Sequence, residues 1–134
     1  MKIKMLLFFL LLGGIVSAQE RSAAVEQAVQ EQTARYNLSA EQIVQMYVVE
    51  ERRERNLQEI EVLRESNYRL YLEKKQSVRK NSEGTIRQIL HKEQRFILDQ
   101  EQAAYRQATS NLIQQMRQDG KSKEDIELAL LERS

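Results

Sequence analysis

Almost nothing in this chain can interrupt a helix. Its 134 residues contain no proline and only four glycines. They are rich in Glu, Gln, Arg, Leu and Ala, the residues that form helices most readily. A β-sheet would need turn residues and alternating β-branched runs, and neither pattern is present. The sequence therefore predicts an all-α protein, and its length favours a single domain.

Residues 1–18 differ from the rest of the chain. Lys2 and Lys4 precede an apolar run, and small residues (VSA) follow it at positions 16–18. The apolar run has about twelve residues, whereas a membrane-spanning helix needs roughly 20. This order is typical of a cleaved secretory signal peptide, with an uncleaved N-terminal anchor as the alternative. We therefore expect residues 19–134 to form one helical domain outside the cytoplasm.

The first long helix has a clear start signal. A short helix with a weak apolar stripe is expected over residues 21–35, and the chain is interrupted at residues 36–38. Ser39 is well placed as an N-cap, and Gln42 can reach back to complete a capping box. Leu38 is available for a hydrophobic staple against Ile43. The stretch Leu38–Gln42 (LSAEQ) thus predicts where a helix begins.

Apolar residues at three- and four-residue steps predict that this helix continues to about Asn81. Such a helix is a rod of roughly 60 Å, which must fold back or dimerise to cover its apolar stripe. The stretch Glu50–Arg55 (EERRER) interrupts the stripe. It is either a solvated segment held by Glu–Arg pairs or a packing gap at a dimer crossing or hinge.

Residues 81–84 (NSEG) form the strongest internal turn signal. A second long helix is expected from residue 85 to Asp119, with Gly120 as its C-terminal stop. Ser122 and Asp125 then form a capping pair for a last short helix. The sequence therefore predicts a long antiparallel helical hairpin with short flanking helices. The length of the apolar stripe further predicts a homodimer.

The helix-start signal occurs twice. Leu90–Gln94 (LHKEQ) resembles Leu38–Gln42, and His91 stands in the place of Ser39. Histidine caps a helix less well than serine, so the second helix either bends here or restarts. The motif residues are Leu38, Ser39, Gln42, Leu90, His91 and Gln94.

Two such boxes about fifty residues apart, behind a signal peptide and in a helical chain without cysteine, resemble the LTxxQ-motif family. This family includes the Spy-like and CpxP-like envelope-stress proteins and relatives labelled periplasmic heavy-metal sensors. The resemblance implies a periplasmic homodimer shaped like a shallow cradle. It also implies that the protein holds partly unfolded clients without ATP. The alternative is a regulatory accessory that binds an envelope sensor kinase or an anti-sigma factor.

A basic segment suggests where clients would bind. Residues 64–95 contain nine bases and four acids, although the chain without its signal peptide is close to −1. This near-neutral balance excludes a strongly basic nucleic-acid-binding protein. The alternative to a client surface is a solvated face with tyrosine rings on an apolar stripe. The candidate client-binding residues are Arg64, Tyr68, Arg69, Tyr71, Lys74, Lys75 and Arg79.

The sequence offers no catalytic or metal-binding constellation. His91 is the only histidine and there is no cysteine, so neither a Cys–His nor a Ser–His–Asp arrangement can be assembled. A transition-metal site would need several converging His, Cys or Met ligands. Glycine-rich phosphate loops are also absent from the sequence. We therefore expect a protein without enzymatic activity, metal or cofactor, and not embedded in a membrane.

Overall fold

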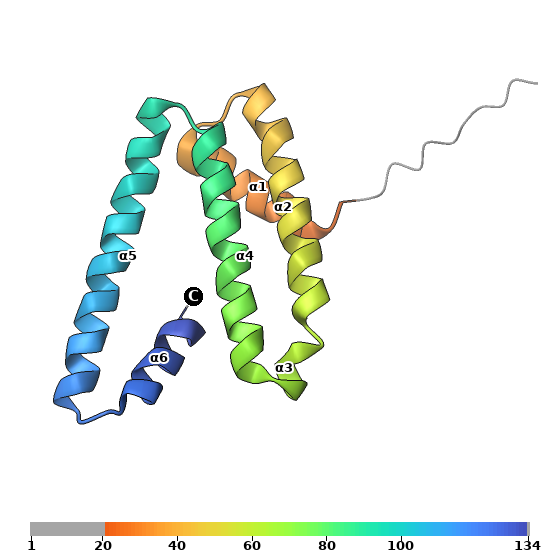
Figure 1. Ribbon diagram of the computed structural model, residues 1–134. Helices are drawn as coiled ribbons and strands as arrows, with labels where there is room; N and C mark the ends of the chain where they lie inside the picture. The colour runs from red at the N-terminus through yellow and green to blue at the C-terminus, as the bar shows by residue number, and fades with distance from the viewer. Residues whose placement is uncertain (1–20, 134) are drawn as a thin grey trace, which may run out of the picture.

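The computed structural model describes residues 21–133, and this part of the chain is α-helical without a strand (Figure 1). The predicted all-α class is confirmed. The predicted signal peptide, residues 1–18, lies outside the described residues. The helices are α1 (Ala23–Tyr36), α2 (Ala40–Ile60), α3 (Leu63–Ser66), α4 (Tyr68–Ile89), α5 (Lys92–Gln118) and α6 (Lys123–Glu132).

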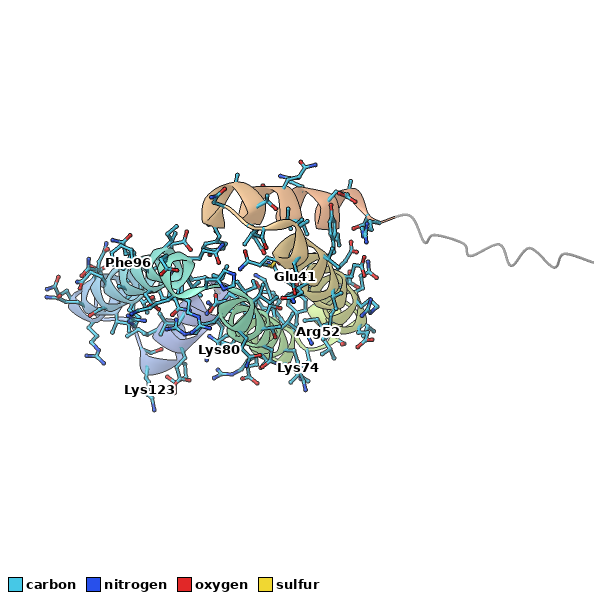
Figure 2. The ribbon with its side chains drawn as sticks, turned by 90° about the horizontal axis from the view of Figure 1, so that it is seen from above. Glu41, Arg52, Lys74, Lys80, Phe96 and Lys123 are labelled. Carbon is cyan, nitrogen blue, oxygen red and sulfur yellow. The ribbon has the colours of Figure 1, made fainter. Side chains whose placement is uncertain are left out.

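Three long helices form one layer. Figure 1 shows α2, α4 and α5 side by side, with α6 folded back between the lower parts of α4 and α5. Viewed from above, α1 lies across one side of this layer, whereas Lys74, Lys80 and Lys123 project from the opposite side (Figure 2). Helix α2 contacts both α1 and α4. Helix α1 therefore covers part of one side of the layer, and α6 lies toward the other side (Figure 2).

The apolar core lies where α1 crosses the layer. Met46 of α2 and Leu90, between α4 and α5, are 0% and 1% exposed. Ile43, Tyr47, Ile89 and Ile97 pack against this cluster. The buried cluster comprises Val25, Val29, Tyr36, Leu38, Met46, Val49, Ile86, Leu90 and Leu98. The core is thus concentrated at one end of the layer, where α2 and α5 begin.

The predicted continuous helix from Ser39 to Asn81 is wrong. Helix α2 ends at Ile60, the single turn α3 follows, and a new helix begins after Asn67. Asn67 has a non-helical backbone (φ −156°, ψ 80°), and its Oδ1 accepts a hydrogen bond from the Leu70 N–H at 3.1 Å. Asparagine is a strong N-cap because its side chain can satisfy a free amide of the first turn. The sequence interpretation overlooked this cap.

The predicted turn at residues 81–84 is also wrong, because α4 runs through it. Val78, Ser82 and Ile86 are spaced four residues apart and are all buried. The Ser82 hydroxyl donates to the Val78 carbonyl at 2.9 Å. One exposed glycine in a helix costs about 1 kcal/mol relative to alanine, and burial of one aliphatic side chain contributes about 1.5–3 kcal/mol. Tertiary burial therefore outweighs the weak local propensity around Gly84.

The second box restarts the helix, which decides between the bend and the restart left open at His91. Leu90 and His91 are extended, with ψ of 137° and 168°, and α5 begins at Lys92. The chain therefore contains three long helices where two were predicted, and its corners lie at residues 61–67 and 90–91.

The predicted ends of the outer helices are confirmed. Asn37 has a left-handed backbone (φ 51°) and ends α1. Gly120 (φ 71°) follows the C-cap of α5. Ser122 and Asp125 form the reciprocal capping box of α6, since each backbone N–H donates to the other side chain at 3.1 Å. Between Arg21 and Arg133, no helix has the length and apolar character that crossing a membrane requires.

The two described glycines predict opposite effects on stability. A Cβ added at Gly84 meets no atom within 4 Å, so Gly84→Ala should stabilise α4 by about 0.5–1 kcal/mol. Gly120 needs a positive φ, so Gly120→Ala should destabilise the protein by about 1–2 kcal/mol. Thermal unfolding followed by circular dichroism should show a higher midpoint for the first variant and a lower one for the second. A lower midpoint for Gly84→Ala would contradict a continuous α4.

Candidate functional site

The two sequence boxes meet in space through their glutamines. Gln42 Nε2 donates to Gln94 Oε1 at 2.8 Å, and Gln94 Nε2 donates to Gln42 Oε1 at 3.0 Å. These residues are 52 positions apart in the chain. Gln42 is only 4% exposed, so this reciprocal amide pair is largely shielded from water.

Each amide also binds backbone groups at both helix starts. Gln42 Oε1 accepts from the Ser39 N–H at 3.0 Å, and Gln94 Oε1 accepts from the His91 N–H at 2.8 Å. The second donor of Gln42 binds the Ile89 carbonyl at 2.9 Å. Gln94 Nε2 lies 3.0 Å from the Tyr36 carbonyl. The pair therefore ties the start of α2 to the start of α5.

The leucines of the two boxes are buried beside this pair. Leu38 is 8% exposed and Leu90 is 1% exposed, and both belong to the core cluster. The sequence predicted that Ser39 and Gln42 start a helix, and this is confirmed by the capping box of α2. It did not predict that the two boxes pair. The motif residues thus form a structural clamp, which we call the glutamine clamp: Leu38, Ser39, Gln42, Leu90, His91 and Gln94.

Three of the predicted client-binding residues gather at the corner between α3 and α4. The Arg64 guanidinium lies 5.1 Å from the centre of the Tyr71 ring and donates to the Tyr71 hydroxyl at 3.0 Å. Tyr68 stacks on Tyr71 with ring centres 6.3 Å apart. Tyr71 is buried, whereas Tyr68 is 46% exposed. Of the two tyrosines, only Tyr68 offers a large accessible surface to a partner.

The other predicted bases do not form one surface. Arg69 pairs with Glu73 at 3.2 Å and with Glu127 of α6 at 3.0 Å. The hydrogen bonds to Glu127, and then to Glu73, raise the pKa of Arg69 above its ordinary value. Lys74 is exposed and projects from the side of the layer opposite α1, whereas Lys75 is half-buried (Figure 2). The positive charge of this segment is therefore partly neutralised and spread around α4.

Arg79, the last predicted residue, instead lines a groove of about 520 Å³ between α4 and α5. The groove is completed by the C-terminal part of α1 and by Arg53 of α2. In its wall the Tyr36 hydroxyl donates to Glu101 Oε2 at 2.9 Å. Burial raises the pKa of Tyr36, and its bond to Glu101 acts in the same direction. The sequence interpretation missed this groove because four separate helices supply its residues.

The EERRER stretch packs against its neighbours. Glu50 is 3% exposed, and its carboxylate accepts from Gln32 of α1 at 2.5 Å and from Arg53 at 3.1 Å. Arg52 donates to the Thr85 hydroxyl of α4 at 2.9 Å. Glu–Arg pairing is thus present, but the stretch is not a purely solvated segment. It links α2 to both α1 and α4.

Within residues 21–133, no group of three or more His, Cys, Asp or Glu side chains is arranged to hold a metal ion. His91 precedes α5 as its N-cap residue.

No protein-family model, curated protein or solved structure matches this chain. The resemblance to the LTxxQ-motif family accordingly depends on the two boxes themselves. In the structure the two boxes pair through Gln42 and Gln94, so the repeat joins two helix starts.

A double-mutant cycle should reveal the energetic coupling of the clamp. Gln42→Leu and Gln94→Leu each leave the other amide and several backbone groups unpaired, so each should cost about 1–3 kcal/mol. The double variant should cost less than the sum of the two, with a coupling of about 0.5–3 kcal/mol. Urea unfolding measures these free energies.

Gln45→Leu is the matched control, since Gln45 is exposed on the next turn of α2. It should change stability by no more than about 0.5 kcal/mol. Strictly additive losses at Gln42 and Gln94 would show that the two amides act independently.

Proposed function

We propose that this protein is a periplasmic holding protein that binds partly unfolded envelope proteins without ATP and acts as a homodimer. The proposal is supported by the resemblance of the two boxes to the LTxxQ motif. The main structural support is the incomplete burial of α5.

Helix α5 has 27 residues, and Leu98 is its one buried residue. Its apolar side chains Ile97, Leu112, Ile113 and Met116 are half-buried, and α6 contacts α5 over a short region. An amphipathic helix in water normally buries its apolar stripe against another element. A helix left this open favours a protein partner, which can be a second copy, a client or both.

Other apolar side chains are exposed on α5 and on α2, which lie on opposite sides of α4 in the layer (Figure 1). Phe96 of α5 is 63% exposed, and Val44 and Val48 of α2 are 65% and 60% exposed. Scattered apolar contacts of this kind, among charges of both signs, are individually weak. They suit a protein that must release many different clients.

A regulatory accessory that binds one envelope sensor kinase or anti-sigma factor is the second candidate. It is favoured by the ion pairing of Arg64, Arg69 and Arg79 with acidic neighbours. Paired bases attract acidic chains less at long range, which makes general capture slower and a dedicated partner more important.

The holding function predicts suppression of aggregation at about one protein per client. Phe96→Gln removes an exposed ring without disturbing the core. If the ring contacts clients, its loss should raise about tenfold the concentration of this protein that suppresses half of the client aggregation. Light scattering of reduced α-lactalbumin measures this concentration. Val62→Gln is the matched control, because Val62 is also exposed (75%) but lies at the corner before α3.

The size of the free protein is determined on the same samples, and about twice the monomer mass is expected because a second copy would cover α5. Absence of suppression at a large excess, together with stoichiometric capture of one membrane protein, would favour the regulatory alternative. A strict monomer would contradict the homodimer.

Export is a separate expectation. The basic, apolar and small residues at positions 1–18 predict cleavage before Gln19. Intact-mass measurement of the protein from the envelope fraction of its own host should give the mass of residues 19–134. A full-length species held in the membrane would favour the uncleaved anchor.

A further inference from the structure

The groove between α4 and α5 combines an apolar floor with a basic rim. Tyr36, Ile86 and Leu98 line it and are all buried. Five basic and two acidic side chains line the same groove, which gives it a net charge of +3, or +2 if Glu50 behind Arg53 is included. The basic residues are Arg35, Arg53, Arg79, Lys80 and Arg106.

Part of this positive charge is not used within the described chain. Three of the five bases pair with acidic residues at 2.6–3.5 Å. Lys80 and Arg106 form no salt bridge with any residue from 21 to 133. Both are exposed, so their charges remain available to a ligand at the rim.

Arg79 contributes a buried donor without an acceptor. Its guanidinium donates to Glu83 at 2.6 Å and lies 5.0 Å from the centre of the Tyr105 ring. These contacts hold the group in place, yet its Nε–H has no hydrogen-bond partner within the described chain. Because this atom has almost no accessible surface, Arg79 adds positive charge to the wall of the groove and is not itself a contact for a ligand.

The groove is short. On α4 its lining residues run from Arg79 to Ile86, about 10 Å at 1.5 Å per residue. Beside its lining residue Tyr105, the Arg133 guanidinium lies 5.1 Å from the centre of the ring. A volume of about 520 Å³ is in the range of small-molecule sites.

We propose that this groove binds a small amphipathic anion. The apolar body of the ligand lies on Ile86, Leu98 and Tyr105, and its acidic head group is held by Lys80 and Arg106. The short lined segment and the volume of about 520 Å³ favour a small molecule over a polypeptide. This activity is independent of client holding and uses a different surface from Phe96.

The probe for the test is 8-anilinonaphthalene-1-sulfonate, an aromatic anion whose fluorescence rises in apolar sites, with decanoate as the competitor. One saturable site per chain is expected, and decanoate should displace the dye. Lys80→Gln/Arg106→Gln should weaken dye and decanoate binding about tenfold or more, because two attractive charges are lost. Binding should also weaken as salt is added.

Arg55→Gln/Lys121→Gln is the matched control. It removes one arginine and one lysine that are exposed and do not line the groove. Binding to this variant should stay within about twofold of the parent, since remote exposed charges are screened. Circular dichroism should show that both double variants remain helical.

Three outcomes would overturn the proposal. The first is an equal loss of binding in both double variants, which would mean general charge attraction. The second is equally tight, variant-independent binding of the neutral analogue N-phenyl-1-naphthylamine, which would mean an ordinary apolar patch. The third is binding to a tetraglutamate peptide or to phosphatidylglycerol vesicles without binding to decanoate. That result would assign the groove to a polypeptide or a membrane surface.

Discussion

The reciprocal hydrogen bonds between the Gln42 and Gln94 side chains hold together two helix starts that lie far apart in the sequence. A shielded amide must have its donors and acceptors satisfied, and each glutamine satisfies the other as well as backbone groups. Gln42 and Gln94 also accept hydrogen bonds from the backbone N–H groups of Ser39 and His91, the residues that precede α2 and α5. The buried core, which includes Leu38 and Leu90, lies around this clamp.

The rest of the layer is held much less firmly. Away from the clamp, α6 is joined to α4 by contacts such as the exposed Arg69–Glu127 pair at 3.0 Å. Exposed ion pairs of this kind contribute about 0–1 kcal/mol. The molecule therefore has a well-packed end and a more weakly packed arm formed by α5 and α6. Under the proposed holding function, such an arm adjusts to different clients while the clamp keeps the helix starts in register.

The distribution of charge follows from the same architecture. The sequence concentrates bases in residues 64–95, yet Arg64, Arg69 and Arg79 are each paired with an acidic side chain in the folded chain. The groove between α4 and α5 instead collects bases from four helices, including Arg106 from outside that segment. Charge density along the chain was therefore a poor guide to charge density in space.

Local interactions explain what could be predicted from the residues alone. A capping box joins side chains and amides three residues apart, so the starts at Ser39 and Ser122 were readable in the chain. The stop at Gly120 was equally local, because a positive φ favours glycine. The all-α class followed from the lack of proline and the scarcity of glycine.

Contacts between residues far apart in the sequence decided the other helix boundaries, the pairing of the two boxes and the groove. Residues 81–84 look like a turn, but α4 continues through them because Val78, Ser82 and Ile86 are buried by other helices. His91 looked like a weak cap, yet a helix begins after it. The Gln94 side chain accepts from the His91 backbone N–H and is itself held by a hydrogen bond from Gln42. Pairing of the two boxes and assembly of the groove depend on residues dozens of positions apart. No window of local sequence contains that information, because it arises only when the helices pack.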